Sequence, residues 1–505
     1  METTVVLEFL VAFLSLFALL LWRNFSLRPS PRLPPGPKPL PILGNLLLLR
    51  KYPSLGDCAT DLEHKFGPIV TLWMWSQPIV FISGPDIIQE AMITEGSVFT
   101  GRPRLASTRY LSDGHRTLLT THGERHRFLR KLLVSRVLSN KRVAECRPIR
   151  EREVDTLIES LKNQILGHDG NIKGGTVTNF RSMIRFTICN LIVGILIGRR
   201  LTPEEFANLD EVMLLRLRLS GGKPRDFLPW LAWLPDKEGV KRQKEVRERT
   251  SQVVKPLVEE RKEALKSGKT DLGSIVDTLL GLQSGEIQSP IEILDSDIVL
   301  LFIEMLNGGT DTTALTLEYC IANLINHPEM QEKLAQEISS VAGDRVVGED
   351  DIRRLPYLQA LVTENLRRHS PAPLSARRAM SATKIAGYDI PADCLVMQHV
   401  EAISLSPEIW EDPLEFRPER FLNKTPDMTG TTEVTMIPFG LGRRICPGLH
   451  IAFIHAEFIL ARLIQAFEWK SAAPGKLVDL SPSKAMTAPM KYPLVANLQE
   501  RLMFS

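Results

Sequence analysis

The distribution of apolar and polar positions along the chain predicts a large, mainly helical body with a small strand-rich region. Two β-branched runs, 69–74 and 78–82, are parted by three residues and are typical of a β-hairpin. A second strand-rich patch is expected at 385–397, with residues 387–391 forming its turn. Most of the chain between these patches follows a helical period. We therefore expect a mainly α fold, with one folded body over residues 46–505.

Three apolar stretches are expected to form prominent helices. Residues 295–326 make a helix that is long for a globular protein and is ended by Pro328. Residues 356–367 begin with a proline, which is favoured in the first turn of a helix. The apolar segment after Gly448 is expected to be a helix packed behind the loop that precedes it.

The N-terminus shows a different pattern, because it is almost continuously apolar. The run from Val5 to Trp22 is interrupted only by Glu8 and Ser15, and it is near the lower length for a bilayer-spanning helix. Basic side chains follow this run and none precedes it, which places the rest of the chain in the cytosol under the positive-inside rule. A cleaved secretory signal has the opposite order. We predict an uncleaved, single-pass membrane anchor over residues 1–22.

A proline-rich segment separates this anchor from the folded body. Six prolines lie between Pro31 and Pro41. Proline fixes φ and lacks a backbone donor, so the segment is a stiff, extended spacer. Residues 23–45 are therefore predicted to be a basic hinge that holds the body at a set angle to the bilayer.

Composition and charge exclude some classes of function. The 505 residues are 44% hydrophobic, which is sufficient for a large core. The net charge is +3, from 62 basic and 59 acidic residues, and this balance gives no indication of a nucleic-acid partner. Six cysteines are scattered without paired spacings, which is typical of free thiols in a reducing compartment.

Cys446 lies in the most informative run of the chain, Pro438 to Gly448, and two arginines, Arg443 and Arg444, stand just before it. Such a glycine-containing loop can present one sulfur to a metal that takes a single protein ligand, and haem iron fits because the porphyrin supplies the equatorial donors. Zinc or an iron–sulfur cluster needs several Cys or His ligands. His450 and His455 follow at helical spacing, but their segment is apolar. The alternative is a glycine loop with a buried cysteine.

The centre of the helix 295–326 carries two adjacent glycines, each of which costs about 1 kcal/mol relative to alanine. Gly308 and Gly309 therefore indicate the close approach of a flat ligand or of a second backbone. Thr312 can bond to a carbonyl of the preceding turn or turn its hydroxyl toward a ligand. Taken alone, the pattern is equally compatible with a glycine patch for helix packing.

Glu364 and Arg367 lie three residues apart in the helix 356–367 and so share one face. An exposed pair of this kind contributes little. It becomes informative with a third partner, for which Arg420 is the candidate.

The order and spacing of these motifs resemble the cytochrome P450 family, from the proline hinge to the C-terminus. Around the cysteine, the residues that match the family's haem-binding signature are Phe439, Gly440, Gly442, Arg444, Cys446 and Gly448. The anchor, the hinge and the runs around Asp311 and Glu364 are most similar to those of plant microsomal members. The resemblance implies the P450 fold and a haem-thiolate monooxygenase, with Cys446 as the axial ligand of haem b and Phe439 among the haem-binding residues.

The resemblance also implies roles for residues outside the cysteine loop. Asp311 and Thr312 would relay protons during cleavage of the O–O bond of dioxygen. A buried structural triad would hold the cysteine loop in place, and it consists of Glu364, Arg367 and Arg420.

The two haem propionates need cations, and the resemblance implies three arginines for this purpose, namely Arg130, Arg378 and Arg444. His126 stands four residues before Arg130, where the family usually has tryptophan. Histidine can still donate a hydrogen bond to a propionate, so we expect binding to be retained with altered anchoring.

Electrons are expected to come from another protein. The sequence has no Gly-x-Gly-x-x-Gly turn after a strand and no phosphate loop, so the chain is not expected to bind NADPH or flavin itself. The resemblance implies an acidic, membrane-bound NADPH–cytochrome P450 reductase that docks near Arg127, Lys131 and the cysteine loop. It also implies a single-pass protein of the endoplasmic reticulum membrane with a cytosolic catalytic domain.

The resemblance implies a substrate pocket, and the family positions that line it are 102–121, 212–220, 302–309, 372–376 and 485–489. These segments are largely apolar, which favours a lipophilic fatty acid, terpenoid or phenolic that is oxidised with O2. Two alternatives stay open. One is a reductase-independent member of the family that rearranges peroxides or dehydrates, and the other is a non-catalytic haem-binding protein.

Overall fold

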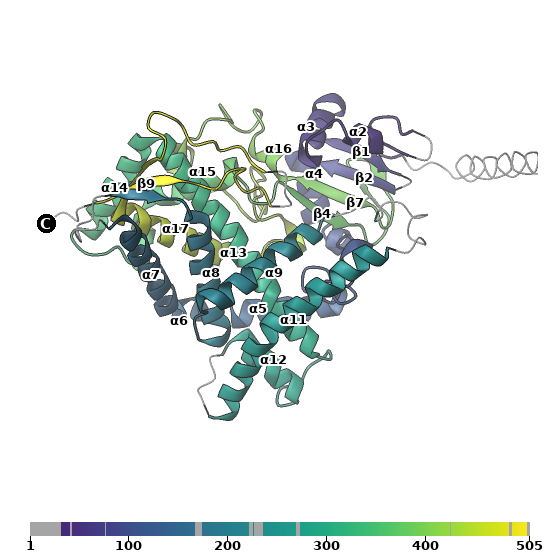
Figure 1. Cartoon of the computed structure of the whole chain (residues 1–505). Coiled ribbons are helices and arrows are strands. Elements are labelled where there is room, and N and C mark those ends of the chain that lie inside the picture. Colours follow the sequence, from purple (N-terminus) through teal and green to yellow (C-terminus); the bar gives the residue numbers. More distant parts are fainter. Residues whose placement is uncertain are drawn as a thin grey trace, which may run out of the picture.

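The computed structural model describes residues 32–501, except for short gaps at 41–42, 76, 167–173, 222–225, 227–235, 269–272, 425 and 484–486. A helical body fills one side of the molecule, and a small sheet with short helices lies at the other side (Figure 1). The predicted anchor over residues 1–22 and the first part of the predicted hinge lie outside the described residues.

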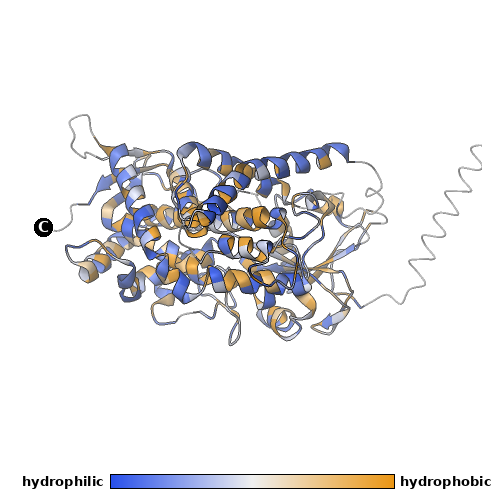
Figure 2. Cartoon of the chain, turned by 90° about the horizontal axis from the view of Figure 1, so that it is seen from below, coloured by the Kyte–Doolittle hydropathy of each residue, from blue (hydrophilic) through white to orange (hydrophobic). Residues whose placement is uncertain are grey.

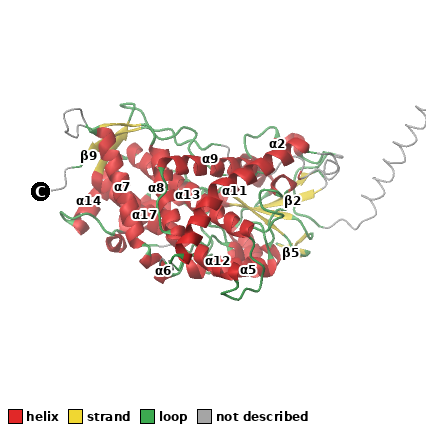
Figure 3. Ribbon diagram, turned by 60° about the horizontal axis from the view of Figure 1, so that its bottom comes forward, coloured by secondary structure: helices red, strands yellow, loops and turns green. Residues whose placement is uncertain are grey.

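The helical body is built around the long helix α13 (Asp295–Asn326), with α8, α15 and α17 packed beside it (Figures 1 and 3). Its other helices are α5 (Gly123–Arg136), α6 (Asn140–Glu145), α7 (Arg147–Ile165), α8 (Phe180–Ile197), α9 (Pro203–Leu219), α11 (Lys237–Lys266), α12 (Ile275–Ser284), α14 (Pro328–Ala342), α15 (Pro356–Arg368) and α17 (Leu449–Ala466). Four short helices lie near the sheet and the loops that leave it: α2 (Leu46–Leu49), α3 (Leu55–Phe66), α4 (Pro85–Gln89) and α16 (Val400–Ser404).

In the described part of the chain, three small sheets accompany the helices. The largest has the strand order β1-β2-β7-β4, the second β3-β9-β8, and the third pairs β5 with β6. Strand β7 joins β2 in parallel, which brings the C-terminal half of the chain to the N-terminal hairpin. The strands are β1 (Ile69–Met74), β2 (Gln77–Ile82), β3 (Gly175–Val177), β4 (Leu374–Arg378), β5 (Thr383–Ile385), β6 (Tyr388–Ile390), β7 (Leu395–His399), β8 (Phe467–Ser471) and β9 (Ala496–Glu500).

The bounds of α13 follow from local chemistry. Near its start, the Asp297 carboxylate accepts a hydrogen bond of 2.9 Å from the Leu294 N–H, and acidic groups favour a helix N-terminus. At its end, His327 leaves the helical conformation directly before Pro328, which restricts the residue that precedes it. Most of the side chains between these ends are buried, so α13 is a core helix.

Hydrophobic residues gather in the interior helices, whereas the outer surfaces are mainly hydrophilic (Figure 2). Two of these helices, α8 and α17, are long and apolar enough to cross a membrane by composition alone. The share of the apolar window that is buried inside the protein is 78% for α8 and 44% for α17. Both helices contribute buried residues to the hydrophobic core, α17 mainly through its second half.

The hairpin and the three prominent helices confirm the sequence-based expectations, including both ends of α13. The turn expected at 387–391 was misplaced. The chain turns one step earlier, at Ala386 and Gly387, which both have positive φ, and Tyr388 already begins strand β6. Glycine accommodates this conformation without strain, and the tyrosine that follows has the β propensity for the strand.

Candidate active site

The loop before α17 presents Cys446 through a tight backbone path. The Cys446 N–H donates to the Phe439 carbonyl at 2.9 Å and closes the loop. Gly440 and Gly442 have φ values of 68° and 69°, a region that residues with a side chain rarely adopt. At Gly442 a Cβ atom would also lie 2.1 Å from the Met92 carbonyl oxygen, so only glycine fits.

The Cys446 side chain is accessible to solvent, yet burial by the surrounding protein is the largest influence on its pKa. Burial raises the pKa of the thiol, while the Gly448 N–H and the positive charge of Arg130 act in the opposite direction. The sulfur thus lines an interior space, and its two polar neighbours both favour the thiolate form.

Arg130 acts electrostatically on this sulfur, and three further arginines interact with Arg130. We call Arg102, Arg130, Arg377 and Arg444 the arginine cluster. Burial and mutual repulsion lower the pKa of Arg102 to about 10 and that of Arg444 to about 9. The pKa values of Arg130 and Arg377 are lowered as well, with burial as the largest cause. Within the described ranges, no carboxylate forms an ion pair with any of the four, so the cluster is a concentration of positive charge without a protein counter-charge.

His126 lies beside this cluster, one turn before Arg130 on α5. It is buried, and desolvation together with the positive charges of Arg444, Arg130 and Arg102 lowers its pKa to about 3. The ring is therefore neutral at physiological pH and can donate one hydrogen bond toward the interior space.

Arg444 connects the cysteine loop to Thr100 and to the loop 101–122 that follows it. Its guanidinium donates to the carbonyl of Thr100 at 2.9 Å, to that of Leu118 at 3.3 Å, and also to that of Thr121. These bonds fix the orientation of the side chain but supply no negative charge.

Neighbouring arginines on β4 face opposite sides of the strand, because the side-chain period of a strand is two. Arg377 is buried and turns toward the cysteine loop, where it donates to the Arg444 carbonyl at 3.5 Å. Arg378 pairs instead with the exposed Asp393. The structure therefore places Arg377 in the arginine cluster, whereas Arg378, the residue favoured by the sequence, has a carboxylate partner of its own.

The two glycines of α13 have different surroundings. One permits helix packing and the other borders open space, which are the two alternatives that the sequence left open. A Cβ atom on Gly309 would lie 2.6 Å from Cδ1 of Ile192, so this glycine permits close packing against α8. A Cβ atom on Gly308 would meet nothing within 4 Å, so this glycine borders open space. Thr312 lies one turn further on and donates its hydroxyl to the Gly308 carbonyl at 2.7 Å.

Asp311 is buried and held by a network that was not apparent from the sequence. Its carboxylate accepts a bond of 2.6 Å from Arg185 of α8. The same guanidinium binds Asp210 of α9 at 2.5 Å, so one cation lies between two carboxylates on different helices. The second oxygen of Asp311, Oδ2, has no hydrogen-bond partner among the described residues. This oxygen is therefore available to a water molecule or a proton.

Glu364, Arg367 and Arg420 meet inside the protein. Glu364 and Arg367 are both fully buried and form two parallel bonds of 2.7 Å. The Arg420 guanidinium lies 3.6 Å from the same carboxylate. Arg367 also donates to three backbone carbonyls, those of Ser404, Pro413 and Glu415. One carboxylate is thus shared by two guanidiniums, and all five donors of Arg367 are used, so the group links α15 to residues 404–420 of the chain before the cysteine loop.

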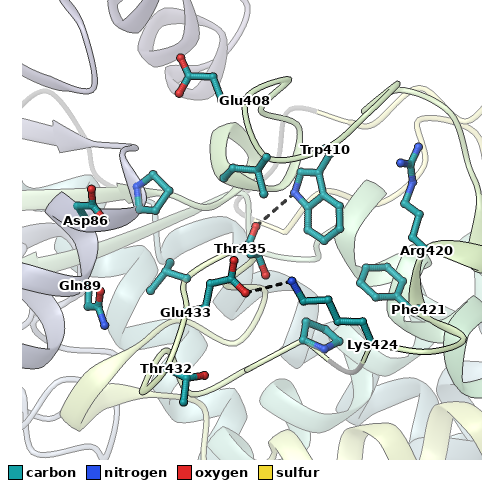
Figure 4. Close-up of a pocket in the computed structure, with 14 residues that line it drawn as sticks. Asp86, Gln89, Glu408, Trp410, Arg420, Phe421, Lys424, Thr432, Glu433 and Thr435 are labelled. Atoms are coloured by element: carbon teal, nitrogen blue, oxygen red, sulfur yellow. Dashed lines mark hydrogen bonds and ion pairs between the residues drawn. The ribbon is translucent and has the colours of Figure 1, made fainter.

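A pocket of about 410 Å³ is lined by Arg420 and its neighbours (Figure 4). Two contacts cross its wall, since the Trp410 indole donates to the Thr435 carbonyl and Lys424 pairs with Glu433. No residue of the cysteine loop lines it. We therefore keep this pocket separate from the site at Cys446.

The segments expected to line a substrate pocket contact one another, although part of 485–489 lies outside the described residues. The Arg102 guanidinium donates to the Ala376 carbonyl at 3.0 Å, and the Arg216 guanidinium donates to the Leu111 carbonyl at 3.1 Å. Glu304 of α13 accepts from the Leu118 N–H at 2.9 Å. These segments therefore carry buried charged groups as well as the apolar residues emphasised by the sequence.

The chemistry of these groups fits a haem. Among the described residues, no three His, Cys, Asp or Glu side chains converge on a possible metal position, so a metal bound by Cys446 needs other donors, as a porphyrin provides. The arginine cluster offers guanidiniums to two propionates. The buried Nε atom of Arg102 has no hydrogen-bond partner within the described part of the chain, as expected for a donor directed at a missing acceptor.

Comparisons with known proteins agree with this geometry. The family model described as Cytochrome P450 matches residues 34–494. Cytochrome P450 98A2 of Glycine max is 31% identical over 95% of each chain. The flavonoid 3'-monooxygenase CYP75B137 of Crocosmia x crocosmiiflora is 31% identical, covering 97% of this chain and 96% of its own length. The isoflavone 2'-hydroxylase of Glycyrrhiza echinata is 33% identical, covering 99% of this chain and 98% of its own length.

Proposed function

The chain belongs to the cytochrome P450 family of haem-thiolate monooxygenases, and from this premise we propose that Cys446 is the axial ligand of its haem iron. The observation that supports this proposal best is the position of the Cys446 sulfur, which is accessible to solvent and lies beside Arg130, a member of an arginine cluster that has no carboxylate partner among the described residues. A thiolate-ligated haem supplies the activation of dioxygen.

We assign the propionate contacts to Arg102, Arg130, Arg377 and Arg444, with His126 as a neutral donor. Arg102 and Arg377 were not among the residues expected from the sequence, and Arg377 replaces Arg378 in this role. The reason is electrostatic, because buried guanidiniums that repel one another are stabilised by an anion placed between them. Phe439 supports the loop through its carbonyl bond to Cys446 and packs against Phe453.

Asp311 and Thr312 move protons in the proposed reaction. One atom of O2 enters a C–H bond of the substrate, and the other leaves as water after taking up two electrons and two protons. The Thr312 hydroxyl lies beside the open face of Gly308 and can exchange its bond to the Gly308 carbonyl for one to oxygen or water. Arg185 keeps Asp311 in place as the acid behind this hydroxyl.

The substrate is proposed to be a lipophilic fatty acid, terpenoid or phenolic, and the reaction its hydroxylation or epoxidation. Two of the relatives are named for acting on flavonoids and isoflavones, which supports the phenolic class. We further propose that electrons come from NADPH through a membrane-bound reductase. The anchor over residues 1–22 would hold the enzyme at the endoplasmic reticulum, with residues 46–505 in the cytosol.

Incubation of the full-length protein with reductase, NADPH and oxygen-18 gas tests the proposal on a panel of fatty acids, terpenoids and phenolics. We expect a product that contains one labelled oxygen atom and forms only with NADPH and reductase. Product formation from a hydroperoxide without either component would instead indicate a peroxide-rearranging enzyme. Haem binding without product from any member of the panel would favour a non-catalytic role.

The Thr312→Ala substitution tests the proton path. We expect product formed per NADPH consumed to fall about 100-fold or more, since a positioned proton-transfer group contributes roughly 10²- to 10⁴-fold, while the haem content stays unchanged. Thr316→Ala is the matched control, because Thr316 makes the same kind of bond one turn later, to the Thr312 carbonyl at 3.0 Å. Equal coupling in the two variants would contradict the assignment.

A further inference from the structure

Arg216 breaks an otherwise apolar stripe on α9. Phe206, Leu209 and Met213 are buried on one face of this helix, and Arg216 continues the same spacing. Only 8% of the arginine is exposed. A charged side chain at such a position requires a compensating interaction, because moving a cation out of water is unfavourable without a partner.

The Arg216 guanidinium has weak support from the protein. It donates to the Leu111 carbonyl at 3.1 Å and, over 3.5 Å, to the hydroxyl of Thr250. Burial lowers the pKa of Arg216, with the more distant Glu304 as an opposing influence. The Glu304 carboxylate is itself engaged by the N–H groups of Leu118 and Leu119 and forms no ion pair with Arg216.

A buried arginine without a carboxylate partner is unusual in this protein. Seven arginines are buried in the described part of the chain, and four of them have carboxylate partners, namely Arg150, Arg185, Arg261 and Arg367. Two of the remaining three, Arg377 and Arg444, belong to the arginine cluster that we assign to the haem propionates. Arg216 is the third, and it lies on a different element, away from the cysteine loop.

Arg216 lies on α9, one of two helices that pack over the part of α13 around Gly308. We call this layer of α9 and α11 the roof. Helices α9 and α11 pack against each other and against α13 (Figures 1 and 3). Arg216 contacts Leu111 in the loop 101–122 and Thr250 on α11, and it interacts electrostatically with Glu304. Glu304 precedes Gly308 by about one helical turn, roughly 6 Å along the axis. Arg216 thus lies near the part of α13 that borders the open space at Gly308, where we propose that the substrate would bind.

We propose that Arg216 binds a carboxylate of the substrate, so that the enzyme prefers amphiphilic acids to their neutral analogues. This inference rests on the proposed monooxygenase function and narrows its substrate class. A guanidinium offers two parallel N–H groups to a carboxylate, and the low polarity of the roof strengthens this pairing. The acid group would be held at the roof while the apolar part extends toward Gly308 and the haem.

Titration of the full-length holoprotein with matched pairs of compounds tests this proposal, with the haem spin-state change as the readout. The pairs are octanoic, lauric and palmitic acids and cinnamic acid, each with its methyl ester. For the best-binding pair we expect the acid to bind about 10- to 100-fold more tightly than the ester, the range for a charge-assisted hydrogen bond. The Arg216→Gln variant should lose this preference and bind the ester as before, whereas Arg216→Lys should retain part of it.

The control variant is Arg249→Gln, since Arg249 lies on the exposed side of α11 and pairs with Glu211. It should keep the full preference for the acid. The proposal is overturned if no acid binds more tightly than its ester, or if Arg216→Gln retains the preference. In either case a normal haem-thiolate spectrum and NADPH-dependent turnover of a neutral compound would leave the proposed function intact, while absence of that spectrum would show that the proposed function itself fails.

Discussion

The arginines around Glu364 and those of the arginine cluster both lie inside the protein, but only the first group has a carboxylate to pair with. Arg367 forms two bonds of 2.7 Å with Glu364, and three backbone carbonyls take its other donors. In the cluster, Arg444 has only backbone carbonyls as partners, and its neighbours repel it. The first group contains its own anion, whereas the arginine cluster contains none, and we propose that the haem propionates supply it.

Loss of a charge is expected to affect stability in the Glu364 group and ligand affinity in the arginine cluster. Removing the carboxylate of Glu364 is expected to lower the stability of the fold, because a buried guanidinium is left without its partner. Removing one guanidinium from the arginine cluster should relieve repulsion in the haem-free protein and weaken the affinity for the propionates. The two regions should therefore respond in opposite ways to loss of a charge.

The largest expected effect comes from Glu364→Ala. This substitution leaves Arg367 and Arg420 buried without their carboxylate, and it should lower the free energy of unfolding by about 3–5 kcal/mol, enough to prevent accumulation of folded holoprotein. Thermal unfolding and soluble yield measure the effect. Glu433→Gln serves as the control, since it removes an exposed ion pair with Lys424 and should change stability little. A stable Glu364→Ala protein would show that the triad is dispensable.

A smaller and different effect is expected from Arg377→Ala. The loss of a charge-assisted contact of about 1.5–3 kcal/mol should weaken haem retention about 10- to 100-fold, while the apoprotein keeps or gains stability because repulsion within the cluster falls. The ratio of haem to protein after dilution measures retention. Arg378→Ala is the matched control on the opposite face of β4, where Asp393 is the partner. If Arg378→Ala lost haem and Arg377→Ala did not, our assignment of the two arginines would be reversed.

The smallest expected effect is on the pH dependence of stability, and it comes from the buried His455. Burial lowers the pKa of His455 from 6.5 to about 3, so between these values the unfolded chain binds a proton that the folded protein does not. The contribution of His455 to stability is therefore full above pH 6.5 and is lost as the pH falls toward 3. Replacing His455 with Asn should flatten the decline in the free energy of unfolding over this window. Substitution of the exposed His450 should leave the decline unchanged.

Much of the fold could be predicted because its signals are local. Helix α13 was located to the residue, since its apolar run begins after acidic residues and ends before Pro328. The turn at Ala386 and Gly387 was misplaced because a glycine can begin or end a turn and periodicity does not decide between the two.

The geometry of the site could be predicted only where all of the residues concerned lie in one continuous motif. The cysteine loop is a single run, whereas Arg185 and Asp311 are 126 residues apart and no pattern connects them. The choice between Arg377 and Arg378 depends on strand register, since a shift of one residue turns a side chain to the other face. Arg102 is recognisable only from its missing partner, which is a property of the folded protein.

The most direct test of the whole account is the spectrum of the reduced protein with carbon monoxide, recorded for the full-length chain and for Cys446→Ser in parallel. We predict that the wild-type protein purifies with haem and gives the red-shifted absorption of an adduct with an anionic sulfur opposite the carbon monoxide. Cys446→Ser should lack that absorption. A colourless wild-type protein, an unshifted adduct, or a shifted adduct that persists in Cys446→Ser would contradict the assignment of Cys446 as the haem ligand.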